Sequence, residues 1–217
     1  MSDTSPLKIH PSAVVDEGAI IGEGTSAWHF SHICSGAIIG QNCSLGQNVL
    51  VADNASLGNN VKVQNNVAIY GGIMIEDDVF LGPSCVLTNV TNPRSQVSRK
   101  NLYEKTLIRK GSTVGANATI VCGITLGRYC FIGAGAVLTK NIPDYGLVLG
   151  NSGKLSGYMS RHGHKLTFNE SGRATCPESK FVYEKADDQV HCLDLDEEEP
   201  LPTELSVGSQ GYDSFKS

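Results

Sequence analysis

The sequence predicts an all-β protein: a parallel β-helix of hexapeptide repeats with one extruded loop and a partly irregular C-terminal tail. Aliphatic residues recur at every sixth position from Ile9 to Leu87, and the same spacing resumes from Ile108 to Leu138. Glycine often follows the aliphatic residue directly, as at Gly22, Gly40, Gly46, Gly58 and Gly82. A period of six matches neither the helical nor the strand period and is typical of a parallel β-helix. An ordinary β-sandwich would give strands at less regular spacings of about 8–12 residues.

The first repeats, residues 9–87, predict a triangular rod. Each hexapeptide supplies a short strand and a turn, so about eighteen residues make one three-sided coil. The aliphatic side chain points inward, and the following glycine suits a corner where a Cβ atom would be crowded. Cys43, Cys85 and Cys130 occupy the small interior position of the repeat, so we expect them to pack in the core. Residues 1–150 are expected to form this rod, about seven coils tall.

One edge of the predicted rod carries a ladder of polar side chains. Residues eighteen apart lie above one another, which stacks His29, Gln47, Asn48, Asn65 and Asn66 on neighbouring coils. The ladder has two interpretations, which are compatible. Amide side chains can bond to the turns of neighbouring coils, or they can line a groove for an uncharged, hydroxyl-rich ligand.

The repeat is interrupted between residues 88 and 107, and we call this excursion the arm. The stretch 88–110 contains six of the fourteen lysines and arginines of residues 1–175, opposed by Glu104 alone. A long loop leaving a regular scaffold is usually functional, and arginine suits phosphate or carboxylate groups. A solvated surface loop remains the alternative, but the charge favours an arm that reaches over an anionic ligand or a neighbouring chain.

In an uninterrupted repeat, the inward position after Leu87 would be residue 93. The repeat instead resumes at Ile108, so the arm inserts fifteen residues into the coil. The edge that carried the polar ladder then continues as "VGANAT" and "IGAGAV". Small side chains there leave backbone N–H and C=O groups accessible, so the edge could hold a long, thin ligand.

The C-terminal region differs in charge and pattern. We expect a cap segment at residues 151–175 and an acidic, mobile tail at 176–217, which has three basic and eleven acidic residues and no periodicity. The sequence shows no signal peptide or membrane span. Seven cysteines without paired spacing favour a cytoplasmic location. Cys176, His191 and Cys192 lack metal-ligand spacing, and no metal, nucleic-acid or membrane partner is expected.

The chain resembles left-handed β-helix acyltransferases, which are trimers that use acyl-coenzyme A. The blocks "WHFSHICSGAIIG", "SLGQNVLV", "VQNNVAIY", "VGANATIVCGITLG" and "GAGAVLTKNIPDY", and the arm itself, resemble a narrower group. These bacterial enzymes acetylate the 3-amino group of UDP-2-acetamido-3-amino-2,3-dideoxy-glucuronate, a precursor of O-antigen and related surface polysaccharides. The left hand of the rod is implied by this resemblance, because general crossover rules favour the right hand.

The resemblance implies that Asn89 holds the sugar amine and that the leaving coenzyme A sulfur takes its proton. Many other hexapeptide acyltransferases use a histidine base instead, for which His29 and His32 are the candidates here. The resemblance and the stacking of residues eighteen apart together predict a UDP-sugar site and a coenzyme A site. The sugar site comprises Asn65, Asn66, Tyr70, Arg94, Arg99, Lys100 and Tyr103. The coenzyme A site comprises Ala116, Asn117, Ala134, Gly135 and Lys140.

The sequence thus predicts a homotrimeric, acetyl-CoA-dependent N-acetyltransferase acting on a UDP-linked amino sugar. Three alternatives remain open: another nucleotide-linked amino sugar with a histidine base, a non-catalytic scaffold, and a zinc-dependent hexapeptide protein. The zinc class needs three histidines around the metal. His29 and His32 have no third partner in register, since His10 precedes His29 by nineteen residues.

Overall fold

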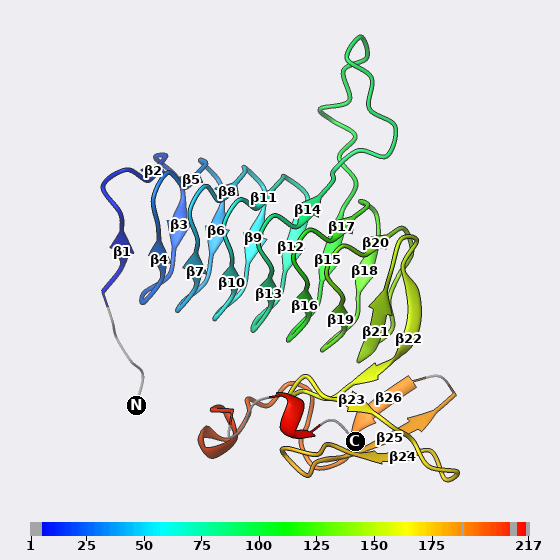
Figure 1. Ribbon diagram of the computed structural model, residues 1–217. Coiled ribbons are helices and arrows are strands. Elements are labelled where there is room, and N and C mark those ends of the chain that lie inside the picture. Colours follow the sequence, from blue (N-terminus) through cyan, green and yellow to red (C-terminus); the bar gives the residue numbers. More distant parts are fainter. Residues whose placement is uncertain (1–5, 188, 209–211, 216–217) are drawn as a thin grey trace.

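The computed structural model describes residues 6–187, 189–208 and 212–215. These residues form a rod of stacked coils with the arm projecting from it and a small C-terminal unit beside it (Figure 1). The predicted parallel β-helix of hexapeptide repeats is therefore confirmed. The described residues contain no α-helix, and their only helical turns are the short 3-10 elements η1 (Thr203–Leu205) and η2 (Tyr212–Phe215).

The rod has three faces built of parallel strands; faces 1 and 3 are each paired continuously, whereas face 2 consists of two sheets, because its fourth and fifth strands do not pair. Face 1 comprises β1 (Lys8–Ile9), β4 (Ser26–Ala27), β7 (Ser44–Leu45), β10 (Lys62–Val63), β13 (Phe80–Leu81), β16 (Thr113–Val114), β19 (Phe131–Ile132) and β21 (Gly146–Leu149). Face 2 comprises β2 (Val14–Val15), β5 (His32–Ile33), β8 (Leu50–Val51), β11 (Ala68–Ile69), β14 (Val86–Leu87), β17 (Thr119–Ile120) and β20 (Val137–Leu138). Face 3 comprises β3 (Ile20–Ile21), β6 (Ile38–Ile39), β9 (Ser56–Leu57), β12 (Ile73–Ile75), β15 (Thr106–Ile108) and β18 (Thr125–Leu126).

The second residue of most two-residue strands points into the rod, as the repeat predicts. Ile33, Leu45, Leu81 and Ile132 are fully buried, and Cys43, Cys85 and Cys130 pack in the same core. Val15 in the first coil is exposed, because the described chain has no coil beneath it to cover the end of the rod.

Corner glycines allow the coils to stack closely. A Cβ atom on Gly82 would lie 2.6 Å from the backbone nitrogen of Ala116, and one on Gly115 would lie 2.5 Å from the nitrogen of Ala134. Contacts this short are not tolerated, so these turns require glycine for reasons of space.

The register across the arm is the predicted one. Ile75 of β12 pairs with Ile108 of β15, which corresponds to one coil plus fifteen inserted residues. The arm is shorter than expected by two residues, because Thr106 and Leu107 already pair with β12 and belong to β15. On face 3 the coils on either side of the arm therefore pair as if it were absent, whereas on face 2 the strand before the arm, β14, does not pair with β11.

The rod ends in an antiparallel extension. β22 (Lys154–Met159) pairs with β21, and β23 (Lys165–Leu166) pairs with β22. β24 (Arg173–Thr175), β25 (Val182–Ala186) and β26 (Gln189–Cys192) form a separate antiparallel sheet. The expected boundary between residues 175 and 176 therefore falls at the end of β24, within one small structural unit.

The C-terminal unit has its own hydrophobic core, which joins it to the last coils of the rod. That core contains Tyr129, Tyr145, Tyr158, Leu166, Ala174, Cys176, Tyr183, Val190 and Cys192. The sequence predicts a mobile segment from residue 176, whereas residues 176–192 supply two of the three strands of this sheet. Its inward residues Tyr183, Val190 and Cys192 were too few and too widely spaced to be recognised as a strand pattern. Residues 188, 209–211, 216 and 217 of the predicted tail lie outside the described part.

An acidic strap, residues 194–199, follows β26 and lies on the rod. Tyr129 donates its hydroxyl hydrogen to the main-chain oxygen of Glu197 at 2.6 Å. Arg161 stacks over the Tyr129 ring at 4.5 Å and donates to main-chain oxygens of the strap. The Glu198 side chain pairs with Arg128. Glu198 of the predicted tail thus neutralises two cations of the rod, Lys110 and Arg128.

Candidate functional site

Three edges separate the faces of the rod. The first edge, between faces 1 and 2, contains residues 47–48, 65–66, 83–84, 116–117 and 134–135. The second edge, between faces 2 and 3, contains residues 70–72, the arm, 121–123 and 139–141. The third edge carries the acidic strap. The predicted site residues lie on the first two edges.

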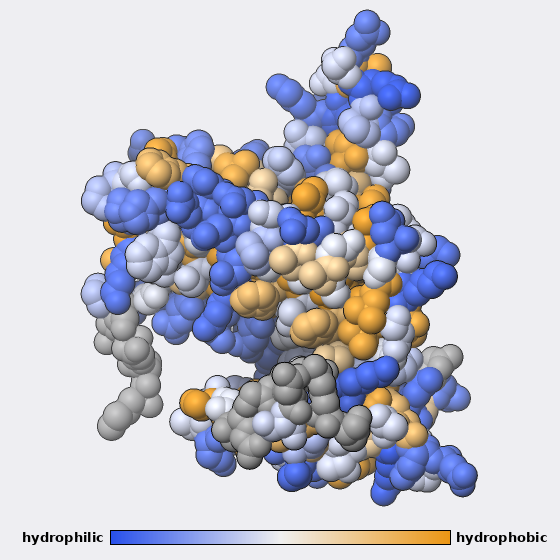
Figure 2. Space-filling model, viewed as in Figure 1, coloured by the Kyte–Doolittle hydropathy of each residue, from blue (hydrophilic) through white to orange (hydrophobic). Residues whose placement is uncertain are grey.

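The arm holds a cavity of about 360 Å³. Four of the predicted sugar-binding residues line it: Arg94, Arg99, Lys100 and Tyr103. Figure 2 shows the arm as mostly hydrophilic where it projects from the rod. Within the described residues, no ion pair involves the three cations of this cavity. The cavity thus offers unneutralised positive charge to a ligand.

The base of the arm is closed by hydrogen bonds. The Glu104 backbone N–H donates to the Asn89 carbonyl at 2.9 Å. The Thr91 backbone N–H donates to the Glu104 carboxylate at 3.0 Å. Hydrogen bonding from Thr91 lowers the pKa of Glu104, so the base of the arm is held by an ionised carboxylate at neutral pH. Higher in the arm, Arg99 donates from Nε to the Asn92 carbonyl at 3.0 Å, which fixes its guanidinium group.

Asn89 stands where the chain leaves face 2. It is half-buried, and its side-chain amide makes no hydrogen bond to any other residue in the described part of the chain. An amide beside a cationic cavity and without a protein partner is available to a polar group of a ligand.

Tyr70 lies below the arm on the second edge. The neighbouring Gly71 is close to Tyr103, since a Cβ atom there would be 3.7 Å from the Tyr103 ring. Both tyrosines are partly exposed. Tyr70, Tyr103 and Asn89 therefore lie on the same edge, and Tyr103 lines the cavity with the cations of the arm.

The first edge carries the remaining predicted sugar contacts, Asn65 and Asn66. The Asn65 side-chain oxygen accepts from the Gln47 backbone N–H at 2.9 Å, and that of Asn66 accepts from the Asn48 amide at 3.1 Å. The turn-ladder interpretation is confirmed for Asn65, which bonds to a turn backbone, whereas Asn66 bonds to the side chain of Asn48. A hollow of about 270 Å³ lies beside the ladder, lined in part by Trp28, His29, Gln47 and Asn65. A ligand groove therefore remains compatible with the ladder.

The predicted coenzyme A contacts on the first edge are stacked as the sequence suggested. The Gly135 backbone N–H donates to the Ala116 carbonyl at 2.8 Å, and Asn117 adopts the left-handed conformation with φ 56°. Lys140 lies on the second edge, after β20. Within one chain, both predicted binding sites are thus divided between two edges that flank face 2.

The candidate histidines lie far from Asn89 along the rod. His32 pairs with Leu50, and Leu50 pairs with Ala68, which places His32 three coils below Val86. At about 4.8 Å per coil this is about 14 Å in height. His29 stacks on His10 with ring centroids 3.6 Å apart, so the prediction that their spacing of nineteen residues keeps them apart is wrong. The structure does not bring either candidate base to Asn89.

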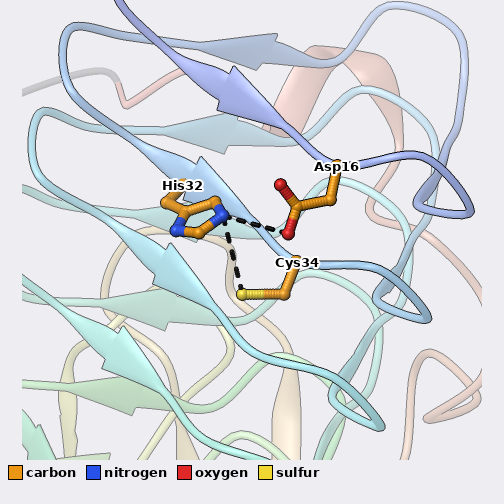
Figure 3. Close-up of side chains that lie close together, drawn as sticks. All are labelled: Asp16, His32 and Cys34. Atoms are coloured by element: carbon orange, nitrogen blue, oxygen red, sulfur yellow. Dashed lines mark hydrogen bonds and ion pairs between the residues drawn. The ribbon is translucent and has the colours of Figure 1, made fainter.

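His32 instead belongs to a cluster with Asp16 and Cys34 on the outside of face 2 (Figure 3). Its Nε2 atom is 3.1 Å from Asp16 Oδ2 and 3.9 Å from Cys34 Sγ. The sequence analysis missed this cluster. The stacking rule could have found it, since Asp16 and Cys34 are eighteen residues apart and His32 is two residues before Cys34.

This cluster is not arranged for nucleophilic catalysis. A catalytic histidine contacts the nucleophile through one ring nitrogen and its orienting carboxylate through the other. Here the thiol and the carboxylate approach the same nitrogen. Burial and the carboxylates of Asp16 and Asp53 also raise the pKa of the Cys34 thiol, which disfavours the thiolate that a cysteine nucleophile requires.

No helix in the described part of the chain is long and apolar enough to cross a bilayer.

Comparison with known proteins identifies the repeat. Residues 18–53, 54–89 and 105–140 match the family of bacterial transferase hexapeptide proteins (six repeats). The chain is 41% identical over 175 residues to dTDP-3-amino-3,6-dideoxy-alpha-D-galactopyranose 3-N-acetyltransferase of Aneurinibacillus thermoaerophilus. That match covers 81% of this chain and 90% of the relative.

Other similarities cover smaller parts. The bifunctional protein GlmU of Synechococcus sp. (strain RCC307) is 31% identical over 137 residues, covering 63% of this chain and 28% of that protein. Among solved structures, a variant of GDP-perosamine N-acetyltransferase from Caulobacter crescentus, in complex with CoA and GDP-perosamine, has a TM-score of 0.51 at 19% identity. That match covers 71% of this chain and 58% of the solved one, and it supports the fold.

Proposed function

The chain belongs to the bacterial hexapeptide transferase family, and from this premise we propose that it transfers the acetyl group of acetyl-coenzyme A to the amine of a nucleotide-linked amino sugar. The observation that carries the proposal is a similarity to an enzyme named for this reaction on a 3-amino sugar. The two sequences are 41% identical, and the match covers 90% of that enzyme. The cationic cavity of the arm supports it, because a nucleoside diphosphate is the anionic part of such a substrate.

The main role of the protein in this reaction is to position the amine and the thioester. The neutral amine attacks the thioester carbonyl carbon, the new C–N bond forms, the C–S bond breaks, and the coenzyme A sulfur takes the proton from the nitrogen. Asn89 is proposed to hold the amine, since its amide has no other partner in the described residues. A base is dispensable, because a sugar amine with a pKa near that of an α-amino group, about 8, has a neutral fraction at pH 7.

The finer proposal for the substrate is a UDP-2-acetamido-3-amino-2,3-dideoxy-glucuronate. Arg94, Arg99 and Lys100 together supply enough charge for a diphosphate and one further carboxylate. A dTDP-linked 3-amino-3,6-dideoxy sugar is the second candidate, favoured by the name of the 41% identical relative.

Steady-state rates with the two sugar nucleotides distinguish these candidates. If the arm binds the sugar carboxylate, the uronate should have the higher kcat/KM and should lose most of that advantage in Arg94→Ala or Lys100→Ala. A higher kcat/KM for the dTDP-linked sugar would favour the second candidate, provided that Arg94→Ala and Lys100→Ala do not lower kcat/KM for the uronate more than for the other sugar.

The arm variant Arg99→Ala should weaken binding of the sugar nucleotide by about 1.5–3 kcal/mol, the range for a charge-assisted hydrogen bond. Calorimetric titration measures this change. Lys105→Ala is a matched control, because it removes one positive charge from the arm outside the cavity lining. The melting temperature should stay constant in both variants, since the arm lies outside the core. Equal affinities in the two variants would mean that Arg99 does not contact the ligand.

The division of the predicted sites between two edges supports a homotrimer with shared sites. Rotation about a three-fold axis parallel to the rod leaves each residue at the same position along the rod. The arm of one subunit can therefore face the first edge of its neighbour at the level of residues 83–84 and 116–117. The same symmetry leaves His29 and His32 of every subunit about 14 Å lower than Asn89, at about 4.8 Å per coil.

The outer surface of face 2, between these edges, offers an apolar contact. Its outward positions include Val14, Leu50, Ala68, Val86 and Val137, together with the polar His32 and Thr119. Val14 and Val86 are 53% and 48% exposed in the single chain. Burial of such residues favours association.

Light scattering coupled to size-exclusion chromatography should therefore give three times the chain mass of 23.1 kDa. A single-chain mass at micromolar concentration would contradict the shared-site arrangement.

A further inference from the structure

The cluster of Asp16, His32 and Cys34 has no role in the proposed acetyl transfer, because it lies about three coils from Asn89 on the rod. We propose that it is a binding site for a divalent transition metal of the zinc class, with three protein ligands and an open fourth position.

The three donor atoms converge on one point. Asp16 Oδ2, His32 Nε2 and Cys34 Sγ all lie within 4.8 Å of one another. Two of the separations are 3.1 Å and 3.9 Å. A tetrahedral zinc ion with bonds of about 2.0–2.3 Å holds its ligands about 3.3–3.6 Å apart. The cluster therefore needs only small side-chain rotations to coordinate a metal.

A ring nitrogen carries either one hydrogen or one lone pair, so a hydrogen bond from Nε2 to the carboxylate at 3.1 Å leaves the thiol at 3.9 Å with only a weak contact. One metal ion would be shared by all three groups. Imidazole, thiolate and carboxylate together form a ligand set that zinc prefers over magnesium or calcium.

The scaffold beneath the cluster is ordered by the coil stacking. Val14 and Val15 pair in register with His32 and Ile33. The Asp16 backbone N–H donates to the Ile33 carbonyl at 2.9 Å, and that of Cys34 donates to the Val51 carbonyl at 2.9 Å. The ligands thus come from adjacent positions of a rigid sheet, which lowers the cost of ordering them.

The site is accessible from outside the single chain. The His32 and Asp16 side chains are 46% and 40% exposed. Cys34 is half-buried, whereas the six other cysteines are buried. The carboxylate of Asp53 lies close enough to interact with Cys34 and adds negative charge beside it. A metal can therefore enter the site of the single chain, and in the proposed trimer, whose subunits pack through face 2, the open fourth position faces the subunit contact.

The test uses the full-length, tag-free protein after dialysis against a chelator and then buffer. Titration with Co²⁺ should give visible bands typical of tetrahedral cobalt and a near-ultraviolet thiolate-to-cobalt band, saturating at one ion per chain. Zinc added to the same sample should abolish both signals, and elemental analysis should then find one zinc per chain. Neither substrate of the acetyl transfer is present, so the result is independent of the proposed function.

Substitutions of the proposed metal-coordinating residues show which side chains produce the cobalt bands. Cys34→Ser should lose the near-ultraviolet band, and Asp16→Asn should weaken binding at least about tenfold. The matched controls Glu17→Gln and His29→Asn should bind like the original protein, and circular dichroism should confirm the fold of every variant. Absence of saturable Co²⁺ binding, or a thiolate band that survives Cys34→Ser, would overturn the proposal.

Discussion

Replacing Asn89 by alanine should lower kcat about 100-fold, the order expected when a reacting group loses its positioning. The half-buried amide stands at the base of the arm, beside the cationic cavity, with no other hydrogen-bond partner in the described chain. An amide cannot accept a proton with useful strength, so its loss should reduce the rate without changing the shape of the pH profile. Asn101→Ala, an exposed position in the same arm, should leave kcat near its original value.

The pH profile separates this mechanism from a histidine base. The rate should rise with pH and level off above the pKa of the substrate amine, in the original protein and in Asn89→Ala alike. A histidine base would add an acidic limb near pH 6.5, approximately the ordinary histidine pKa. If that limb disappears in His29→Asn or His32→Asn while Asn89→Ala stays active, the histidine is the base and the base-free mechanism is wrong.

Replacing Leu81 by alanine should destabilise the rod by about 2–5 kcal/mol, the range for buried leucine truncation. Leu81 is fully buried in β13, and its backbone lies between the coils of Val63 and Val114. A cavity at this point cannot collapse easily, because both neighbouring coils are fixed by parallel pairing.

Thermal or denaturant unfolding measures this change. Leu102→Ala removes the same atoms from the arm, where the leucine is 61% exposed, and should change stability by less than about 0.5 kcal/mol. A similar loss in the two variants would contradict the assignment of the arm as a part outside the core.

The rod was predictable because one rule governs it. An inward aliphatic residue at every sixth position fixes the strand, the coil and the register, which is why the pairing of Ile75 with Ile108 across the arm was expected correctly. The arm was predictable because it breaks that rule. The C-terminal unit obeys no such rule, since its short antiparallel strands are built around scattered residues such as Tyr145 and Tyr183.

The site was predictable only in part. Sequence position put Arg94, Arg99 and Lys100 on one arm, and the cavity there does bring them together. Asn65 and Asn66 lie on a different edge from Tyr70 and Tyr103, because β11 of face 2 separates them, so one chain does not bring the whole predicted set together. The cluster of Asp16, His32 and Cys34 escaped notice because its ligands come from two coils, whereas ligand motifs are usually recognised along one segment.

The central claim is acetyl transfer to a nucleotide-linked amino sugar, and one measurement tests it most directly. Purified protein is incubated with acetyl-coenzyme A and a 3-amino sugar nucleotide, and free thiol release and product mass are followed together. The account predicts that thiol appears in step with a sugar nucleotide heavier by one acetyl group, carried as an amide at the 3-position, and that both signals fall sharply in Asn89→Ala. Thiol release without an acetylated sugar nucleotide, or no release with either the UDP-linked or the dTDP-linked candidate, would contradict it.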